Sequence, residues 1–196
     1  MLRWRGKVSG TEGGSLLLFG PALGLCRGLS LGAFGFAELQ VAELGAQVTK
    51  IEPPSGDVGR IASPMINGQS AYYLQLNGGK QNLCIDLNWP EARAAVYTLC
   101  VEADVIVENF RPGTMKSFGL DYESIVADNP EIVFVSISGY GQVNPWCGRP
   151  AFAPTVQAEC GATHTLLEHF GEQLNAPTSD WASHADLYTG LEGAIA

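Results

Sequence analysis

Asp104-Val105-Ile106-Val107-Glu108-Asn109-Phe110-Arg111-Pro112-Gly113 is the stretch of this sequence that decides the fold. Its first half, residues 104–108, is a short apolar run that is typical of a buried strand. Pro112 and Gly113 then predict a sharp turn into a helix. A polar turn at the carboxyl end of a parallel strand is where open α/β sheets bind ligands. Residues 109–111 are therefore candidate ligand-binding residues.

The segments on either side of this stretch alternate between strand-like and helix-like patterns. Strands are expected at 47–51, 82–87 and 132–137, and helices at 34–44, 91–102 and 122–128. Apolar strands that are joined by helices imply a parallel sheet with both faces covered. The sequence therefore predicts an α/β fold built on a Rossmann-like, doubly wound parallel sheet.

The two ends of the chain differ from this middle part. We expect residues 1–24 to form an atypical, poorly ordered leader, with an organellar transit peptide as the alternative. The apolar run 15–19 is far too short to span a membrane. Residues 25–150 are assigned to the Rossmann-like domain and 151–196 to a helical segment. That segment is expected to hold a weak helix near 155–168 and a small-residue helix over 181–196.

The composition is that of an ordinary globular chain. It has 196 residues, 46% hydrophobic and 16% charged, enough for one domain with a sizeable core. A net charge of −9 disfavours a non-specific nucleic-acid binder, although a local basic pocket for phosphate is compatible with it. The five scattered cysteines indicate neither a zinc site nor a disulfide framework. We expect a cytoplasmic protein with no nucleic-acid or membrane partner and no metal.

Two basic residues flank the loop that follows the strand at 47–51. Lys50 and Arg60 are placed so that either side chain can reach a phosphate or an adenine group at the strand end. The alternative is a solvated lysine and an arginine that pairs with Asp57 or Glu52, since surface ion pairs are common. The residues alone leave both interpretations open.

Two further segments hold candidate reactive or substrate-binding groups. Asp186 begins the last small-residue helix, and a lone carboxylate entering an apolar helix is a candidate covalent nucleophile. It is equally a residue type that often caps helices. Gly139, Tyr140 and Gly141 follow the apolar strand 132–137, where they form either a ligand-facing edge or an ordinary glycine-rich strand exit.

Taken in order, these segments resemble the class III CoA-transferase family, which includes the formyl-CoA and carnitine CoA-transferases. The corresponding family patterns are LGA-x-V-x-K-x-E-x-P-x-GD-x-x-R at 44–60, N-R-G-K-R-S-x-x-L-D-L at 77–87, V-x-N-F-R-P-G at 107–113, S-I-S-G-[FY]-G at 136–141, P-A-F-D-x-x-x-Q-A-x-S-G at 150–161 and x-x-D-x-x-x-G at 184–190. In the fifth of these, the chain has Ala153 in place of the family's aspartate.

The resemblance implies that CoA, as the acyl-CoA substrate, lies along the strand ends. Asn109 would hydrogen-bond the CoA and Phe110 would pack on it. The substrate pocket would include Gly139, Tyr140 and Gly141. The family carries basic residues where this chain has Gly78, Gln81 and Ser117. The full set of CoA-binding candidates is Lys50, Arg60, Lys80, Asn109, Phe110, Arg111 and Lys116.

The resemblance also implies a reaction and an assembly. Asp186 matches the family's nucleophile, which forms a mixed anhydride and then an aspartyl-CoA thioester before a carboxylic acid accepts the CoA. Family members form interlocked homodimers. The resemblance covers only about the first half of a family member, so the chain is interpreted as a truncated part of a CoA-transferase family III fold.

Two other functions stay open. One is a non-catalytic CoA- or nucleotide-binding fragment, or a degenerate half of a longer protein. The absence of basic residues at Gly78, Gln81 and Ser117 favours this alternative, and the presence of Asp186 opposes it. The other is an acyl-CoA racemase, a branch of the family with a His-Asp pair where this chain has Phe152-Ala153. Racemisation needs a proton acceptor and a proton donor on opposite faces of the carbon, so the missing histidine argues against it.

Overall fold

A six-stranded sheet forms the centre of the computed structural model, which describes residues 3–5, 27–31, 35–171 and 184–195. The five strands other than β1 pair in parallel, and β1 lies antiparallel to β8 at one edge. This arrangement confirms the predicted parallel α/β sheet. Across the sheet the order is β1 (Arg3–Arg5), β8 (Val133–Ser136), β7 (Val105–Glu108), β2 (Arg27–Leu31), β3 (Gln47–Glu52) and β6 (Gln81–Cys84).

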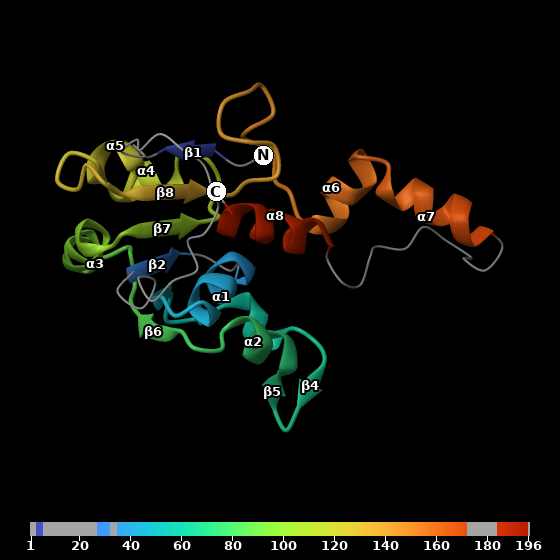
Figure 1. The fold of residues 1–196 in the computed structure, drawn as a ribbon, viewed down its shortest axis with the longest axis horizontal. Helices are drawn as coiled ribbons and strands as arrows, with labels where there is room; N and C mark the ends of the chain where they lie inside the picture. The colour runs from blue at the N-terminus through green and yellow to red at the C-terminus, as the bar shows by residue number, and fades with distance from the viewer. Residues whose placement is uncertain (1–2, 6–26, 32–34, 172–183, 196) are drawn as a thin grey trace, which may run out of the picture.

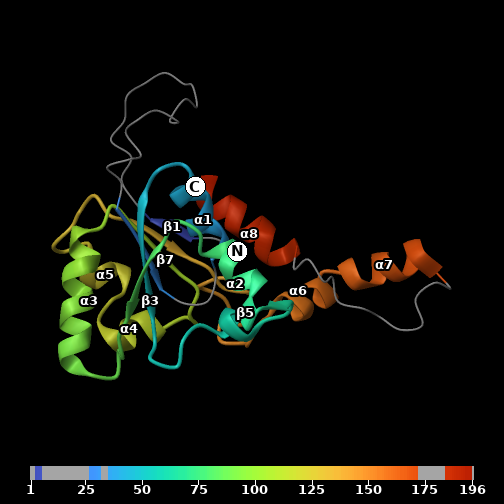
Figure 2. The same ribbon diagram turned by 90° about the horizontal axis from the view of Figure 1, so that it is seen from below.

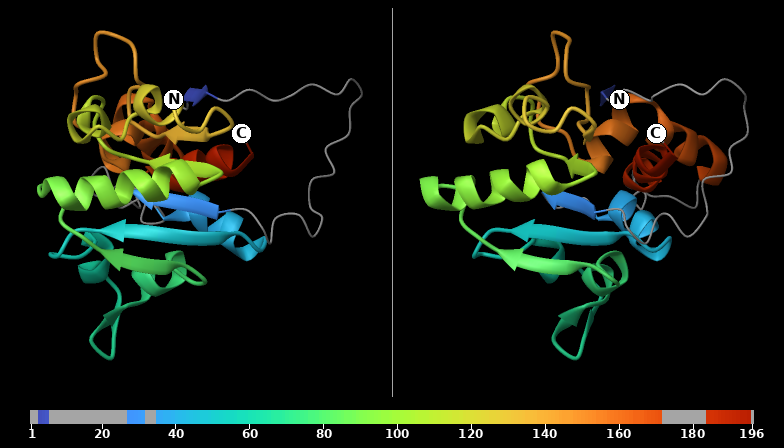
Figure 3. Two further views of the ribbon diagram at one scale, coloured as in Figure 1. Left: turned by 90° about the vertical axis from the view of Figure 1, so that its left-hand side faces the viewer. Right: turned by 60° about the vertical axis from the view of Figure 1, so that its left-hand side comes forward.

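Helices cover both faces of the sheet, as a doubly wound fold requires (Figures 1 and 2). In Figure 3, α3 runs in front of the strands, whereas α1 and α8 lie behind them. One face carries α3 (Pro90–Glu102), α4 (Thr114–Phe118) and α5 (Tyr122–Ile125), and the other carries α1 (Phe36–Glu43) and α8 (His184–Ile195).

The core is divided by the sheet because successive side chains of a strand point to opposite faces. Ile106 of β7 and Phe134 of β8 pack with the buried residues of α3, α4 and α5. Their neighbours Val107 and Val135 pack on the other face with Ala37 of α1. Strands buried on both sides explain why these segments read as continuous apolar runs.

The strand order reverses between β2 and β7. From β2 the chain proceeds outward through β3 to β6, and then returns to the other side of β2 to form β7 and β8. At such a reversal the loops after adjacent strands diverge and leave a crevice at their carboxyl ends. The fold therefore places its ligand-binding edge beside the turn that follows β7.

Several elements were not predicted individually. A short hairpin of β4 and β5 projects below α2 in Figure 1, and its turn uses the left-handed residues Asn67 and Gly68. Helices α6 and α7 extend away from the sheet in Figures 1 and 2. The bounds are η2 (Val58–Ile61), β4 (Met65–Ile66), β5 (Gln69–Ser70), α2 (Ala71–Leu76), α6 (Ala153–Glu159) and α7 (Ala162–Phe170).

The ends of the chain are described only in part. Of the expected leader, residues 3–5 are described and form β1, and the rest lies outside the described residues. The same holds for 181–183 of the last expected helix, whose described part is α8. Among the helices that the structure describes, none combines the length and the apolar character needed to cross a membrane.

Candidate active site

A cavity of about 490 Å³ lies at the carboxyl edge of the sheet and gathers residues from segments that are far apart in the sequence. The turn after β7 contributes Asn109, Phe110 and Arg111 to its lining, the loop after β8 contributes Gly139, and α8 contributes Asp186. Five of the residues predicted from the sequence thus share one cavity. The convergence of residues 109–111 with Gly139 follows from the strand order, because the carboxyl ends of parallel strands meet at one edge, while the packing of α8 on α1 brings Asp186 to the same place.

Asp186 lies in the first turn of α8, which packs against α1 and α6. Its side chain is half-buried in the cavity wall. Burial raises the pKa of the Asp186 carboxyl above its usual range, because charge is less well solvated there. A desolvated carboxylate in a cavity is a more reactive nucleophile than one that is fully hydrated.

The turn that carries Asn109 and Phe110 is held by the residue before it. The Glu108 side chain is buried and accepts a 2.9 Å hydrogen bond from the Phe110 amide. Burial raises the pKa of Glu108 to about 6, against the opposing hydrogen bonds from the Ser136 side chain and the Phe110 amide. Sequence reasoning missed Glu108, although an acidic residue that ends a buried strand is itself a signal of such a role.

A second wall of the cavity is built by η2 and α2. Its lining residues include Val58 and Gly59 of η2, and Tyr72 and Leu76 of α2. Burial raises the pKa of the Tyr72 hydroxyl, and the negative charge of Asp186 raises it further. Tyr72 is therefore a functional candidate that the sequence analysis missed. No local pattern distinguishes it from the adjacent Tyr73.

A third wall is the loop between β8 and α6. Gly139 is packed so closely that a Cβ at this position would stand 2.1 Å from the Cβ of Ala151. The Arg149 guanidinium lies 4.8 Å from the centre of the Tyr140 ring and pairs with Glu159 at 2.5 Å. Tyr140 thus packs beneath Arg149, and the structure does not bring it or Gly141 into the cavity lining with Gly139.

The turn after β7 also borders two further hollows. One, of about 200 Å³, is lined by Arg111 and Lys116 together with Glu108 and Gln142. The other, of about 330 Å³, lies between β3, the residues after β6 and the Phe110 ring. That ring packs edge-to-face against Phe118, with 6.4 Å between the ring centres. Phe110 therefore stands between the large cavity and a mainly apolar hollow beside it.

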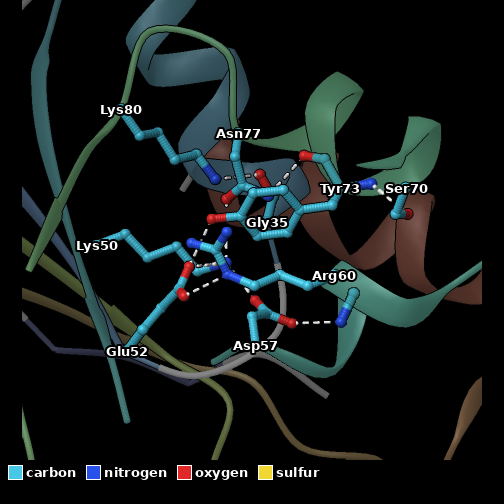
Figure 4. A network of polar contacts seen from close by, with 10 residues as sticks. Gly35, Lys50, Glu52, Asp57, Arg60, Ser70, Tyr73, Asn77 and Lys80 are labelled. Carbon is cyan, nitrogen blue, oxygen red and sulfur yellow. Dashed lines mark hydrogen bonds and ion pairs between the residues drawn. The ribbon is translucent and has the colours of Figure 1, made fainter. Parts of the chain in front are cut away.

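Lys50 is a buried residue, and Figure 4 shows the polar side chains that surround it. Its side chain is 2% exposed, and its ammonium contacts the Asp57 carboxylate, the Asn77 Oδ1 at 3.0 Å and the Glu52 Oε1 at 3.5 Å. The expected alternative of a solvated lysine is therefore wrong. Direct contact between Lys50 and CoA stays a prediction, and this geometry does not favour it.

Arg60 and Lys80 also have partners within the chain (Figure 4). The Arg60 Nε donates to the Glu52 Oε2 at 2.8 Å, and its guanidinium lies 4.2 Å from the centre of the Tyr73 ring. Burial opposes ionisation of Glu52, but the hydrogen bonds from Arg60 and Tyr73 and the charge of Lys50 lower its pKa overall. The Lys80 ammonium donates to the Gly35 carbonyl at 2.8 Å.

The described residues contain no group of three or more histidine, cysteine, aspartate or glutamate side chains arranged to hold a metal ion. The groups that the cavity walls offer for chemistry include the carboxylate of Asp186, the phenol of Tyr72 and the guanidinium of Arg111. A half-buried carboxylate that shares a cavity with a glycine-rich loop and an Asn-Phe-Arg turn is suited to attack an electrophilic carbonyl.

Comparison with known proteins identifies relatives of this chain. The family model for CoA-transferase family III matches residues 29–196. The acetyl-CoA:oxalate CoA-transferase of Acetobacter aceti is 40% identical over 131 residues, which are 66% of this chain and 33% of that protein. The human succinyl-CoA:glutarate CoA-transferase is 34% identical over 80% of this chain and 35% of its own length.

Solved structures with the same fold are known. A CAIB/BAIF family protein from Brucella suis superposes with a TM-score of 0.79 and 32% identity, covering 88% of this chain and 47% of that one. The protein Rv3272 from Mycobacterium tuberculosis gives a TM-score of 0.75 at 30% identity, covering 87% of this chain and 48% of that one. The chain thus spans less than half the length of these relatives.

Proposed function

This chain belongs to CoA-transferase family III, and from that membership we propose that it transfers CoA between an acyl-CoA and a carboxylic acid. The observation that carries the proposal is the cavity in which Asp186 meets the Asn109-Phe110-Arg111 turn. Two of the relatives described above are named for transfer from an acyl-CoA to an acid, oxalate in one and glutarate in the other.

We propose Asp186 as the nucleophile. Its carboxylate oxygen attacks the thioester carbonyl, the C–S bond breaks, and CoA leaves as the thiolate with an aspartyl acyl anhydride left behind. The thiolate then attacks the aspartyl carbonyl of that anhydride, which releases the first acid and leaves an aspartyl-CoA thioester. A second carboxylate then attacks the carbonyl of the aspartyl-CoA thioester, which releases the CoA thiolate and forms a new anhydride. The thiolate attacks the acyl carbonyl of that anhydride, so the new acyl-CoA departs and the Asp186 carboxylate is regenerated.

The walls around Asp186 support this sequence of steps. An anhydride hydrolyses readily in water, so the cavity must exclude water while the intermediates exist. The close Gly139–Ala151 contact keeps that part of the wall tight. Backbone amides of the loop that starts at Gly139 are the proposed donors to the tetrahedral oxyanion.

We propose that the CoA lies along the cavity and the two hollows that border the turn after β7. Asn109 and Phe110 contact the CoA from the turn after β7, and the apolar hollow beyond Phe110 suits an adenine ring. The cations proposed for its phosphates are Arg60, Lys80, Arg111 and Lys116. We propose that Gly139 borders the acyl group, that the protein is a homodimer, and that it acts in the cytoplasm.

The decisive experiment is to search for the covalent intermediate. The protein is incubated with an acyl-CoA, digested, and analysed by mass spectrometry for a CoA-sized addition on the peptide that contains Asp186. Asp186→Asn removes this adduct, whereas Glu192→Gln, which changes an exposed acid on the same helix, retains it. CoA binding without any adduct or transfer would instead indicate a CoA-binding protein that does not catalyse the reaction.

A further inference from the structure

Four charged side chains form a compact cluster beneath the wall made by η2 and α2 (Figure 4). They are Lys50, Glu52, Asp57 and Arg60, two cations and two carboxylates. The side chains of Lys50, Glu52 and Asp57 are only 2–3% exposed, while that of Arg60 is 44% exposed. Burial of three charges is costly unless each is paired and hydrogen-bonded, so the cluster depends on its geometry.

The carboxylates tie this cluster to the two elements of the wall. The second Asp57 oxygen accepts a 2.6 Å hydrogen bond from the Gly59 amide and so caps η2. Glu52 accepts a 2.6 Å hydrogen bond from the Tyr73 hydroxyl of α2. Each carboxylate therefore connects the cluster to one of the elements that line the Asp186 cavity.

The amide of Asn77 ties the end of α2 to the same cluster. Its Oδ1 accepts a hydrogen bond from the Lys50 ammonium at 3.0 Å, and its Nδ2 donates to the Tyr73 carbonyl at 2.8 Å. Lys50 thus joins the Asp57 carboxylate, at the start of η2, to Asn77, at the end of α2.

We propose that Lys50 is a positioning residue whose buried ammonium fixes η2 and α2 against β3 and thereby shapes a wall of the Asp186 cavity. The wall residues that depend on it are Val58, Gly59, Tyr72 and Leu76. This role rests on the proposed function where turnover is concerned, but the fixing of η2 and α2 is a property of the fold itself. It differs from direct contact with CoA, because the Lys50 side chain is almost fully buried.

The test uses a double variant that removes one cation and one carboxylate together, so that an effect of Lys50 on the position of η2 and α2 can be distinguished from a loss of overall stability. Lys50→Met alone leaves Asp57 and Glu52 buried with Arg60 as the remaining cation of the cluster, and we expect it to fold poorly. The double variant Lys50→Met with Asp57→Asn leaves Glu52 paired with Arg60, and the introduced asparagine keeps an oxygen for the Gly59 amide. The matched control is Arg93→Met, which removes one positive charge from α3 on the opposite face.

Amide hydrogen exchange on the full chain reads out the wall directly. In the double variant we expect exchange at η2 and α2 to become at least about tenfold faster, with β7 and β8 unchanged. Arg93→Met leaves all four elements unchanged. Unaltered protection of η2 and α2 in the folded double variant would overturn the proposal, whether or not the chain shows any transferase activity.

Turnover supplies the second readout. We expect the double variant to lose about ten- to a hundredfold in kcat, since a shift of about 1 Å in a site has effects of that size, while KM for the acyl-CoA stays within about twofold. The ratio of thioester hydrolysis to CoA transfer rises because the loosened wall admits water. Full recovery of kcat with restored folding would show that Lys50 contributes stability alone. Absence of transfer in the unmodified chain would refute the proposed function and leave the exchange result to decide this inference.

Discussion

The Phe110 amide donates a 2.9 Å hydrogen bond to the Glu108 carboxylate, so the turn that carries Asn109 is closed by the residue that ends β7. Glu108 is buried, and its pKa is raised to about 6. An acid whose pKa is higher in the folded state than in the unfolded state destabilises the fold once it ionises. Stability should therefore fall as the pH rises from about 4.5 to about 6, by about 2 kcal/mol.

Glu108→Gln tests this relationship, because glutamine keeps an oxygen for the Phe110 amide but does not ionise. Urea unfolding of the two proteins between about pH 4 and about pH 8 should show that the variant lacks this fall and is the more stable one at the upper end by about 2 kcal/mol. Equal pH dependence in both proteins would mean that Glu108 titrates in its ordinary range.

Asp186 should impose an acid limit on turnover. As the proposed nucleophile, the Asp186 carboxylate must be ionised to attack, and burial raises its pKa. We therefore expect kcat/KM to fall as the pH is lowered, beginning at a pH above the usual range of an aspartate. The pH–rate profile of the unmodified protein measures this limb, and Glu192→Gln should leave it in place. A profile that stays flat down to the ordinary aspartate range would contradict the burial of this carboxyl group.

Gly139 should tolerate no side chain while Ala151 is present. Gly139→Ala puts two Cβ atoms 2.1 Å apart, and we expect a loss of about 1–3 kcal/mol in the free energy of unfolding together with lower kcat. Ala151→Gly in the same chain removes one of those atoms and should restore part of both. If the second change gives no recovery in urea unfolding, the contact does not limit this wall.

The adjacent tyrosines of α2 should respond in different ways. Tyr73→Phe removes the 2.6 Å hydrogen bond to buried Glu52 and should cost about 1–3 kcal/mol of stability. Tyr72→Phe removes the hydroxyl of a residue that lines the Asp186 cavity, so it should lower kcat with little change in stability. Thermal unfolding and initial rates of both variants test this prediction. A loss of stability in Tyr72→Phe with a loss of kcat in Tyr73→Phe would contradict the orientation of α2.

The strands of the central sheet were predictable because a strand that is buried on both faces has a continuous apolar sequence. The runs expected at 104–108 and 132–137 are the observed β7 and β8 to within one residue at each end, since both are buried on two faces. From there, the rule that ligands bind at the carboxyl edge of such a sheet predicted Asn109 and Gly139 as neighbours, whereas Asp186, on a helix, was proposed from the family resemblance.

Elements that depend on tertiary contacts were not predictable. Helix α2 has only six residues, and besides its Ser70 cap it is held by the hydrogen bond from Tyr73 to Glu52, a tertiary contact that no local pattern reveals. The single helix expected near 155–168 is two helices because Gly161 adopts a φ of 85°. The burial of Lys50 likewise requires Asp57 and Asn77 to be brought together by the fold.

The hairpin of β4 and β5 is a part of the fold that can change in sequence and length while the central sheet stays the same. It connects η2 to α2 and projects from the molecule, while the pairing of β2 with β7 that assembles the cavity does not involve it. Insertions or deletions in this hairpin would therefore alter the wall beside Asp186 without disturbing the sheet.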